Sequence, residues 1–191
     1  MLLQKVIKKQ IFAAKKEAVI DLGSNSIRML IFEDFNKSQI PIFNEKAVCS
    51  LGNTLSLTGK LDPLGVQYSL SVLERFNNIL QNAKVNDVYI FATAAVRDAK
   101  DGEHFKQVVE KIFNKEVEVL TGDQEAERSA NGVILGYEKV NGIVADLGGG
   151  SLELARVKNN VIEKKASLQI GVLRLFKKKK KKKSKKINEI I

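Results

Sequence analysis

Apolar and polar positions along the chain predict three strands, then alternating helices and strands, then three strands again. The opening strands are short apolar runs that end in polar or turn residues, and they are expected at 18–23, 28–33 and 41–49. A helix with one apolar face is expected over 61–83, where Asp62 and Pro63 supply an N-cap and a first-turn proline. The chain therefore opens as a strand meander followed by a helix.

The rest of the pattern alternates and then returns to its beginning. A strand at 87–93, a helix at 102–113, a strand at 117–120 and a helix at 124–137 follow in order. Three further strands are expected at 142–150, 152–157 and 161–168. This second run of three strands repeats the opening pattern, and the first strand of each run ends in Asp-Leu-Gly, so we expect a duplicated architecture of the α/β class.

Net charge is distributed unevenly along the 191 residues, whose formal charge is +10 and whose composition is 44% hydrophobic. Residues 176–191 carry nine Lys and one Glu, and residues 1–16 carry five Lys and no acid, which leaves 17–175 at about −3. We expect a basic leader over 1–16 and a disordered, solvated Lys-rich tail over 176–191. A mildly acidic body with few aromatic residues predicts no specific nucleic-acid partner.

The single cysteine and the single histidine limit the kinds of catalytic and metal site that the sequence can form. Cys49 has no partner for an intrachain disulfide, which fits a reducing cytoplasm, and its strand setting favours a buried small side chain over a nucleophile. His104 is the only histidine, which disfavours Ser–His or Cys–His hydrolysis and His-rich metal sites. No apolar stretch has the length of a signal peptide or a membrane span, so we expect no membrane partner.

The candidate chemistry lies in two matching loops, DLGSNS at 21–26 and DLGGGS at 146–151, each between two predicted strands. Glycine permits the tight turn and close approach that let successive N–H groups face a phosphate. The proposed phosphate-binding residues in the two loops are Gly23, Ser24, Asn25, Ser26, Gly148, Gly149, Gly150 and Ser151. Either loop alone could be a plain hairpin, whereas two of them imply a cleft, and no Walker or GxGxxG loop competes with them.

Five segments together resemble the exopolyphosphatase/guanosine pentaphosphate phosphohydrolase (Ppx/GppA) family. They occur in that family's order and approximate spacing, and they read AVIDLGSNSIRMLIFE, FATAAVRDAKDGEHF, VLTGDQEAERSANGV, IVADLGGGSLEL and SLQIGVLRL. The resemblance runs from about 17 to 175. It implies an actin-like ATPase (ribonuclease H-like) α/β fold, with one complete lobe over 17–122 and the first strands of an incomplete second lobe over 123–175.

The resemblance also implies roles for individual residues. Glu125 aligns with the family's general base, and Arg97 aligns with an arginine that contacts phosphate, although a surface arginine at a strand end is the alternative. Asp146 and Glu153 align with acids associated with magnesium, and Asp21 at the equivalent strand end joins them as a candidate ligand of Mg²⁺ or another divalent cation. Glu153 could instead be an ordinary exposed strand residue.

Two features depart from the family pattern. Glu127 lies two positions beyond Glu125 and adds negative charge, which either raises the pKa of the proposed base or points away from it. After Leu175 the Lys run replaces the further strands and helices of a second lobe, so we expect a chain that is truncated or altered in reading frame there. Arg28, on the second strand, could contact phosphate or remain solvated.

The function implied by the resemblance is hydrolysis of phosphoanhydride bonds in inorganic polyphosphate or guanosine pentaphosphate, with a divalent cation, in the cytoplasm. Family members are often homodimeric. Two alternatives stay open: a truncated fragment that binds polyphosphate without hydrolysing it, and an actin-like ATPase or kinase, which would need an adenosine-binding region in the second lobe.

Overall fold

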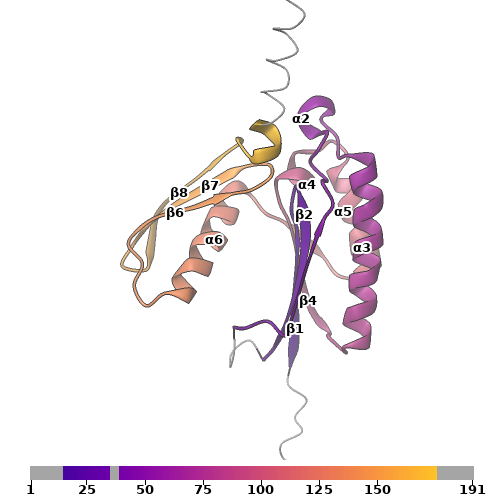
Figure 1. The fold of residues 1–191 in the computed structure, drawn as a ribbon, viewed down its shortest axis with the longest axis horizontal. Helices are drawn as coiled ribbons and strands as arrows, with labels where there is room; N and C mark the ends of the chain where they lie inside the picture. Colours follow the sequence, from indigo (N-terminus) through magenta and orange to yellow (C-terminus); the bar gives the residue numbers. More distant parts are fainter. Residues whose placement is uncertain (1–14, 35–38, 176–191) are drawn as a thin grey trace, which may run out of the picture.

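The computed structural model describes residues 15–34 and 39–175, which form two sheets with helices packed against them (Figure 1). The first sheet has five strands in the order β3-β2-β1-β4-β5. Their bounds are β1 (Lys16–Leu22), β2 (Ser26–Glu33), β3 (Phe43–Val48), β4 (Asp87–Ala92) and β5 (Val117–Val119). Strands β1, β2 and β3 are antiparallel, and β4 and β5 run parallel to β1. This ribonuclease H-like order confirms the predicted actin-like α/β fold.

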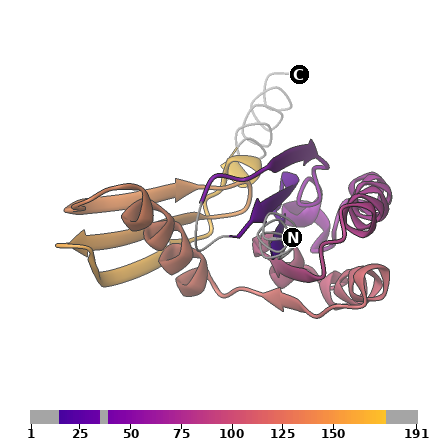
Figure 2. The same cartoon turned by 90° about the horizontal axis from the view of Figure 1, so that it is seen from below.

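Helices α3 (Pro63–Asn82) and α5 (Gly102–Phe113) cover one face of the first sheet (Figures 1 and 2). Alternation along β1 directs Ile20 to that face, where it packs with Phe76 of α3 and Val109 of α5, and all three are fully buried. The side chain of Asp62 accepts the N–H of Gly65 and Pro63 begins the helix, so the predicted start of α3 is confirmed. We call this sheet with its helices the first lobe.

Two short helices escaped the sequence pattern. Helix α2 (Leu55–Thr58) follows β3, and helix α4 (Ala94–Asp98) begins directly after β4. In α4 the residues 94–96 are all buried, so the apolar run reads as a continuation of the strand. Arg97 therefore lies on a helix and not at a strand end as the alternative interpretation had it.

The second sheet is antiparallel, in the order β6-β7-β8, and repeats the opening meander as predicted. Its strands are β6 (Gly142–Leu147), β7 (Leu152–Lys158) and β8 (Val161–Leu168), and α6 (Gly122–Gly136) packs on one face. The buried centre is small, and consists of Ala130, Ala155 and Val157. We call this sheet with α6 the second lobe.

Helix α6 also contacts the first lobe. It begins with a capping box between Thr121 and Gln124. One turn later, the Arg128 guanidinium lies 4.1 Å from the centre of the Phe91 ring on β4. The helix therefore lies between the two sheets, as Figure 1 shows, and its first turn reaches the ends of β1 and β4.

The predicted leader 1–16 lies outside the described residues except for its last two positions, and Lys16 already begins β1. The predicted tail 176–191 lies outside them entirely. Cys49 is 4% exposed, which confirms that it is a buried side chain. Among the helices in the described part of the chain, none combines the length and hydrophobicity needed to span a bilayer.

Gly102, at the start of α5, is a position where a single methyl group is expected to be costly. A Cβ there would lie 1.9 Å from the backbone oxygen of Val96, so Gly102→Ala must displace α4 or α5. We expect a loss of about 2–3 kcal/mol in the free energy of unfolding, measured by urea denaturation. Gly132→Ala, in α6 with no atom within 4 Å of a new Cβ, is the matched control and should gain up to about 1 kcal/mol. Equal effects from both variants would contradict the packing argument.

Candidate active site

The two glycine loops face each other across a pocket of about 180 Å³ between the lobes. A Cβ added to Gly149 would lie 3.1 Å from Ser24 Cβ, and one added to Gly150 would lie 2.7 Å from Ser24 Oγ, so the loops are in direct contact at their tips. The pocket is lined by Asp21, Gly23, Ser24, Asn25, Ser26, Thr93, Ala94, Glu125, Asp146, Gly148, Gly149, Gly150, Ser151 and Glu153. Its volume suits one phosphate group with a few waters.

Both loops make the same turn. Gly23 N–H donates to the Ser26 carbonyl at 3.0 Å, and Gly148 N–H donates to the Ser151 carbonyl at 2.9 Å. Each DLG sequence ends its strand one residue before this turn, so the repeat seen in the sequence is a repeat of backbone geometry.

The segment that follows the third strand of each meander holds the carbonyl oxygens of the loop. In the first lobe, Gly52 N–H donates to the Ser24 carbonyl at 2.7 Å, and the N–H groups of Cys49 and Ser50 both donate to the Asn25 carbonyl. In the second lobe, the N–H groups of residues 171–173 donate to the carbonyls of residues 148–150 at 3.0–3.2 Å. We call residues 49–52 the first brace and residues 171–173 the second brace.

Four backbone N–H groups at the loop tips are the candidate donors to an anion. Within the described residues, those of Ser24, Asn25, Gly149 and Gly150 donate to no other group. Adjacent unpaired N–H groups of this kind form anion-binding concavities. The second brace depends on Gly171, because a Cβ there would lie 2.3 Å from the Gly150 carbonyl carbon.

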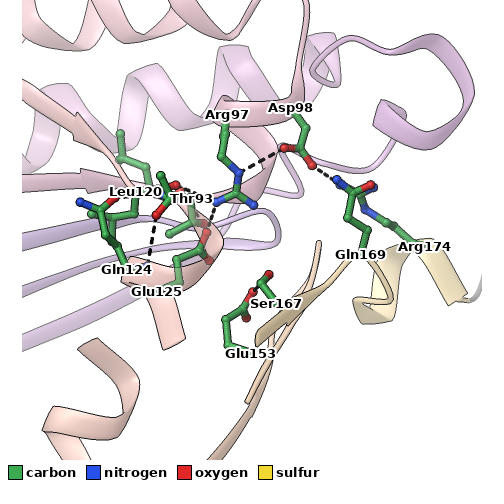
Figure 3. Close-up of polar contacts among 12 residues, drawn as sticks. Thr93, Arg97, Asp98, Leu120, Gln124, Glu125, Glu153, Ser167, Gln169 and Arg174 are labelled. Atoms are coloured by element: carbon green, nitrogen blue, oxygen red, sulfur yellow. Dashed lines mark hydrogen bonds and ion pairs between the residues drawn. The ribbon is translucent and has the colours of Figure 1, made fainter. Parts of the chain in front are cut away.

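Glu125, in the first turn of α6, faces the pocket and pairs with Arg97 (Figure 3). Its side chain is only 12% exposed. Burial raises the pKa of Glu125 to about 7 and outweighs the opposing effect of Arg97, and the nearby carboxylates of Glu153 and Asp21 add a smaller upward contribution. A carboxyl group with a pKa near neutrality is suited to exchanging a proton with a reactant.

Arg97 lies on the side of Glu125 away from the pocket, and it is not among the residues that line the pocket. Its Nη1 donates to the Leu120 carbonyl at 2.7 Å as well as to Glu125 Oε1, and its Nε donates to Asp98 Oδ1 at 3.2 Å. The predicted contact between Arg97 and phosphate stays a prediction. In this arrangement the guanidinium orients the carboxylate and favours its ionised form.

Three more acids converge on the pocket. Asp146 and Glu153 are register partners on β6 and β7, which puts their side chains on the same face of the second sheet. Ser129 Oγ donates to Asp146 Oδ2 at 2.7 Å, and Ser167 Oγ donates to Glu153 Oε1 at 2.8 Å. Glu153 is 3% exposed, so the alternative of an ordinary exposed strand residue is wrong.

Burial and the nearby carboxylate of Asp146 raise the pKa of Asp21 to about 6. Among the described residues, no group of three or more His, Cys, Asp and Glu side chains is arranged to hold a metal by itself. Mg²⁺ takes one or two protein carboxylates and completes its shell with phosphate oxygens and water. The carboxylates of Asp21 and Asp146, which repel each other beside the two glycine loops, fit that requirement.

Thr93 and Ala94 line the pocket and were not predicted. In the sequence, the signal for them was the pair of small residues that directly follows β4 and meets the tip of the second loop.

Glu127 pairs with Lys165, and this pairing lowers the pKa of Glu127. Glu127 is not among the groups that perturb the pKa of Glu125. Of the two interpretations, Glu127 therefore points away. Arg28 Nε donates to Asn44 Oδ1 at 2.9 Å, outside this pocket.

Residues 30–189 match the sequence profile of the Ppx/GppA phosphatase family. The chain belongs to this family. It is 29% identical over 160 residues to exopolyphosphatase 1 of Mycobacterium bovis, covering 82% of this chain and 46% of that protein. It is 27% identical over 155 residues to the guanosine-5'-triphosphate,3'-diphosphate pyrophosphatase of Aeromonas hydrophila, covering 81% of this chain and 31% of that protein.

Among solved structures, an exopolyphosphatase from Cytophaga hutchinsonii matches with a TM-score of 0.79 and 31% identity, over 85% of this chain and 53% of that one. The Ppx/GppA chain described here thus spans about a third to a half of the length of these relatives. The predicted family, and the predicted correspondence to its N-terminal part, are confirmed.

The raised pKa of Glu125 has a consequence for stability. Because the folded state holds this proton more tightly than the unfolded chain, ionised Glu125 reduces stability increasingly as the pH rises from about 4.5 to about 7, and the reduction is complete above that range. Glu125→Gln should therefore raise the thermal unfolding midpoint at pH 8, by about 2–4 °C per kcal/mol, and change it little at pH 4. The matched control is Glu127→Gln on the same helix, where the lowered pKa predicts a shift of the opposite sign at pH 8. A destabilised Glu125→Gln at pH 8 would contradict the assignment.

Proposed function

We propose that this Ppx/GppA chain forms the phosphate-binding and water-activating part of a phosphohydrolase that cleaves phosphoanhydride bonds of inorganic polyphosphate or guanosine pentaphosphate. The observation that carries the proposal is the meeting of two braced glycine loops, with unpaired N–H groups, and the Glu125 carboxylate at one pocket. The likeness to an exopolyphosphatase and to a guanosine pentaphosphate pyrophosphatase supports both substrates.

The terminal phosphoryl group of the substrate would lie between the loops. N–H groups of Ser24, Asn25, Gly149 and Gly150 would bind its oxygens, which neutralises part of the charge that builds up during transfer. Hydrolysis of this kind depends chiefly on positioning and on charge stabilisation. The contact between the loop tips limits the space for anything larger at this point.

Glu125 would act as the general base. It accepts one proton from water as the water oxygen bonds to the terminal phosphorus, and the bond from that phosphorus to the bridging oxygen breaks. Inorganic phosphate leaves, and the shortened chain retains the bridging oxygen and its electron pair. Arg97 holds the carboxylate in place and favours its ionised form before the attack.

One or two of the carboxylates of Asp146, Glu153 and Asp21 would hold Mg²⁺ or another divalent cation, and phosphate oxygens and water would complete its shell. When bound, such a cation supplies positive charge beside the transferred phosphoryl group. The hydrogen bonds from Ser129 and Ser167 fix two of these carboxylates in orientation.

A cytoplasmic location is proposed with this activity, since Cys49 is a buried free thiol in a sequence with no second cysteine. The dimeric state implied by the family resemblance stays a prediction. The alternative of an actin-like ATPase or kinase stays a prediction as well, since a pocket of about 180 Å³ would receive the phosphate end of either kind of substrate.

Replacing the proposed base gives the direct test. Glu125→Gln removes the proton acceptor and keeps the shape of the side chain, so phosphate release from polyphosphate and from guanosine pentaphosphate should fall by about 10²–10⁴-fold. Glu127→Gln is the control and should retain activity, because its carboxylate pairs with Lys165 away from the pocket. Release should require Mg²⁺ and stop with a chelator. Binding of polyphosphate without hydrolysis by the unaltered chain would replace this proposal with the binding-only alternative.

The pKa of Glu125 predicts the pH dependence of the reaction. Only the ionised carboxylate accepts a proton, so kcat/KM should rise with pH, reach half its limit near pH 7 and level off above it. Initial rates of phosphate release between pH 5.5 and 9 would measure this. On the acid side of the profile, kcat/KM should change about tenfold per pH unit. Activity that declines from pH 6 to pH 8 would exclude Glu125 as the base.

A further inference from the structure

Asp98, at the end of α4, is shared by two arginines. Its Oδ1 accepts from Arg97 Nε at 3.2 Å, and its Oδ2 pairs with Arg174 Nη2 (Figure 3). Arg174 also donates from Nη1 to Gln169 Oε1 at 2.9 Å. The side chains of Asp98 and Arg174 are 18% and 20% exposed, so most of the pair is shielded from solvent.

Arg174 directly follows the second brace, in the helical turn 172–175. The N–H groups of this brace hold the carbonyls of the second glycine loop. The ion pair between Asp98 and Arg174 therefore connects that loop to helix α4 of the first lobe. A continuous series of contacts runs from the second loop through Arg174, Asp98 and Arg97 to Glu125.

The charges along this series are balanced against one another. Asp98 and Glu125 both attract the Arg97 guanidinium, from opposite edges. Arg174 neutralises one oxygen of Asp98 and leaves the other for Arg97 Nε. Without Arg174, the whole carboxylate of Asp98 would compete with Glu125 for Arg97, and the second brace would lose its contact with α4.

We propose that Asp98 and Arg174 are positioning residues, which hold the second phosphate loop and the Arg97–Glu125 pair at a fixed spacing across the pocket. The inference rests on the proposed hydrolysis and adds two residues that do not line the pocket. Their role is to preserve geometry, because a displacement of about 1 Å at a reacting group costs on the order of 10²-fold in rate.

An ion pair within the second lobe provides a control. Arg156 Nε lies 3.1 Å from Glu163 Oε2 between β7 and β8, and these side chains are 61% and 37% exposed. Exposed pairs of this kind contribute little to stability. Arg156→Gln removes the same charge as Arg174→Gln and leaves the pocket untouched.

The experiment measures kcat, KM and the affinity for inorganic triphosphate in six proteins: the unaltered chain, Asp98→Asn, Arg174→Gln, their double variant, Arg174→Lys and Arg156→Gln. We expect Asp98→Asn and Arg174→Gln each to lower kcat by roughly tenfold or more. The double variant should be no worse than the poorer single one, because both remove the same link. Arg174→Lys should recover most of the rate, and Arg156→Gln should match the unaltered chain.

Calorimetric binding of triphosphate separates this proposal from the proposed function. If the unaltered chain releases no phosphate, hydrolysis is wrong for it, and the same ranking of variants is then expected in affinity, since the spacing of the loops determines how well both contact one anion. Additive losses in the double variant, or equal behaviour of Arg174→Gln and Arg156→Gln in kcat and affinity, would overturn the positioning role. A lowered thermal midpoint with unchanged kcat and affinity would likewise reduce the pair to a structural contact.

Discussion

Backbone bracing of the two glycine turns is the constraint on which the pocket depends. A glycine turn is free to adopt many conformations, and it presents its N–H groups to a ligand only if its carbonyl groups are engaged elsewhere. Here the braces 49–52 and 171–173 engage those carbonyl groups through backbone N–H groups, which every substitution except one to proline leaves in place. The site is therefore preorganised by topology, since each brace follows the third strand of its own meander.

Negative charge is concentrated where a polyanion is proposed to bind. This concentration of charge contributes to the raised pKa values of two of the acids in the pocket. The carboxylates of Asp21, Glu125, Asp146 and Glu153 surround the same pocket. Burial and mutual repulsion raise the pKa of Asp21 and Glu125, which shows that the ionised forms are costly without further positive charge. Backbone N–H groups, Arg97 and a divalent cation would supply it from three sides.

The meanders, the major helices and the loop positions could be predicted because each has a local signature. Strand alternation, the Asp62–Pro63 start of α3 and the repeated DLG sequences are all contained in short windows. The link from Glu125 through Arg97 and Asp98 to Arg174 could not be found this way, since it joins residues up to 76 positions apart that no periodicity relates. Helix α4 was missed because five residues, three of them buried, are too few to display a helical period.

The order of loops and braces along the chain has a consequence for biosynthesis. The first turn acquires its support as soon as residue 52 has left the ribosome, whereas the second turn waits for residues 171–173, at the far end of the described sequence. A nascent chain that already contains both DLG sequences still lacks a finished anion cradle. Recognition of a ligand by both turns thus waits until residue 173 has been made, although the second DLG sequence is complete at residue 148.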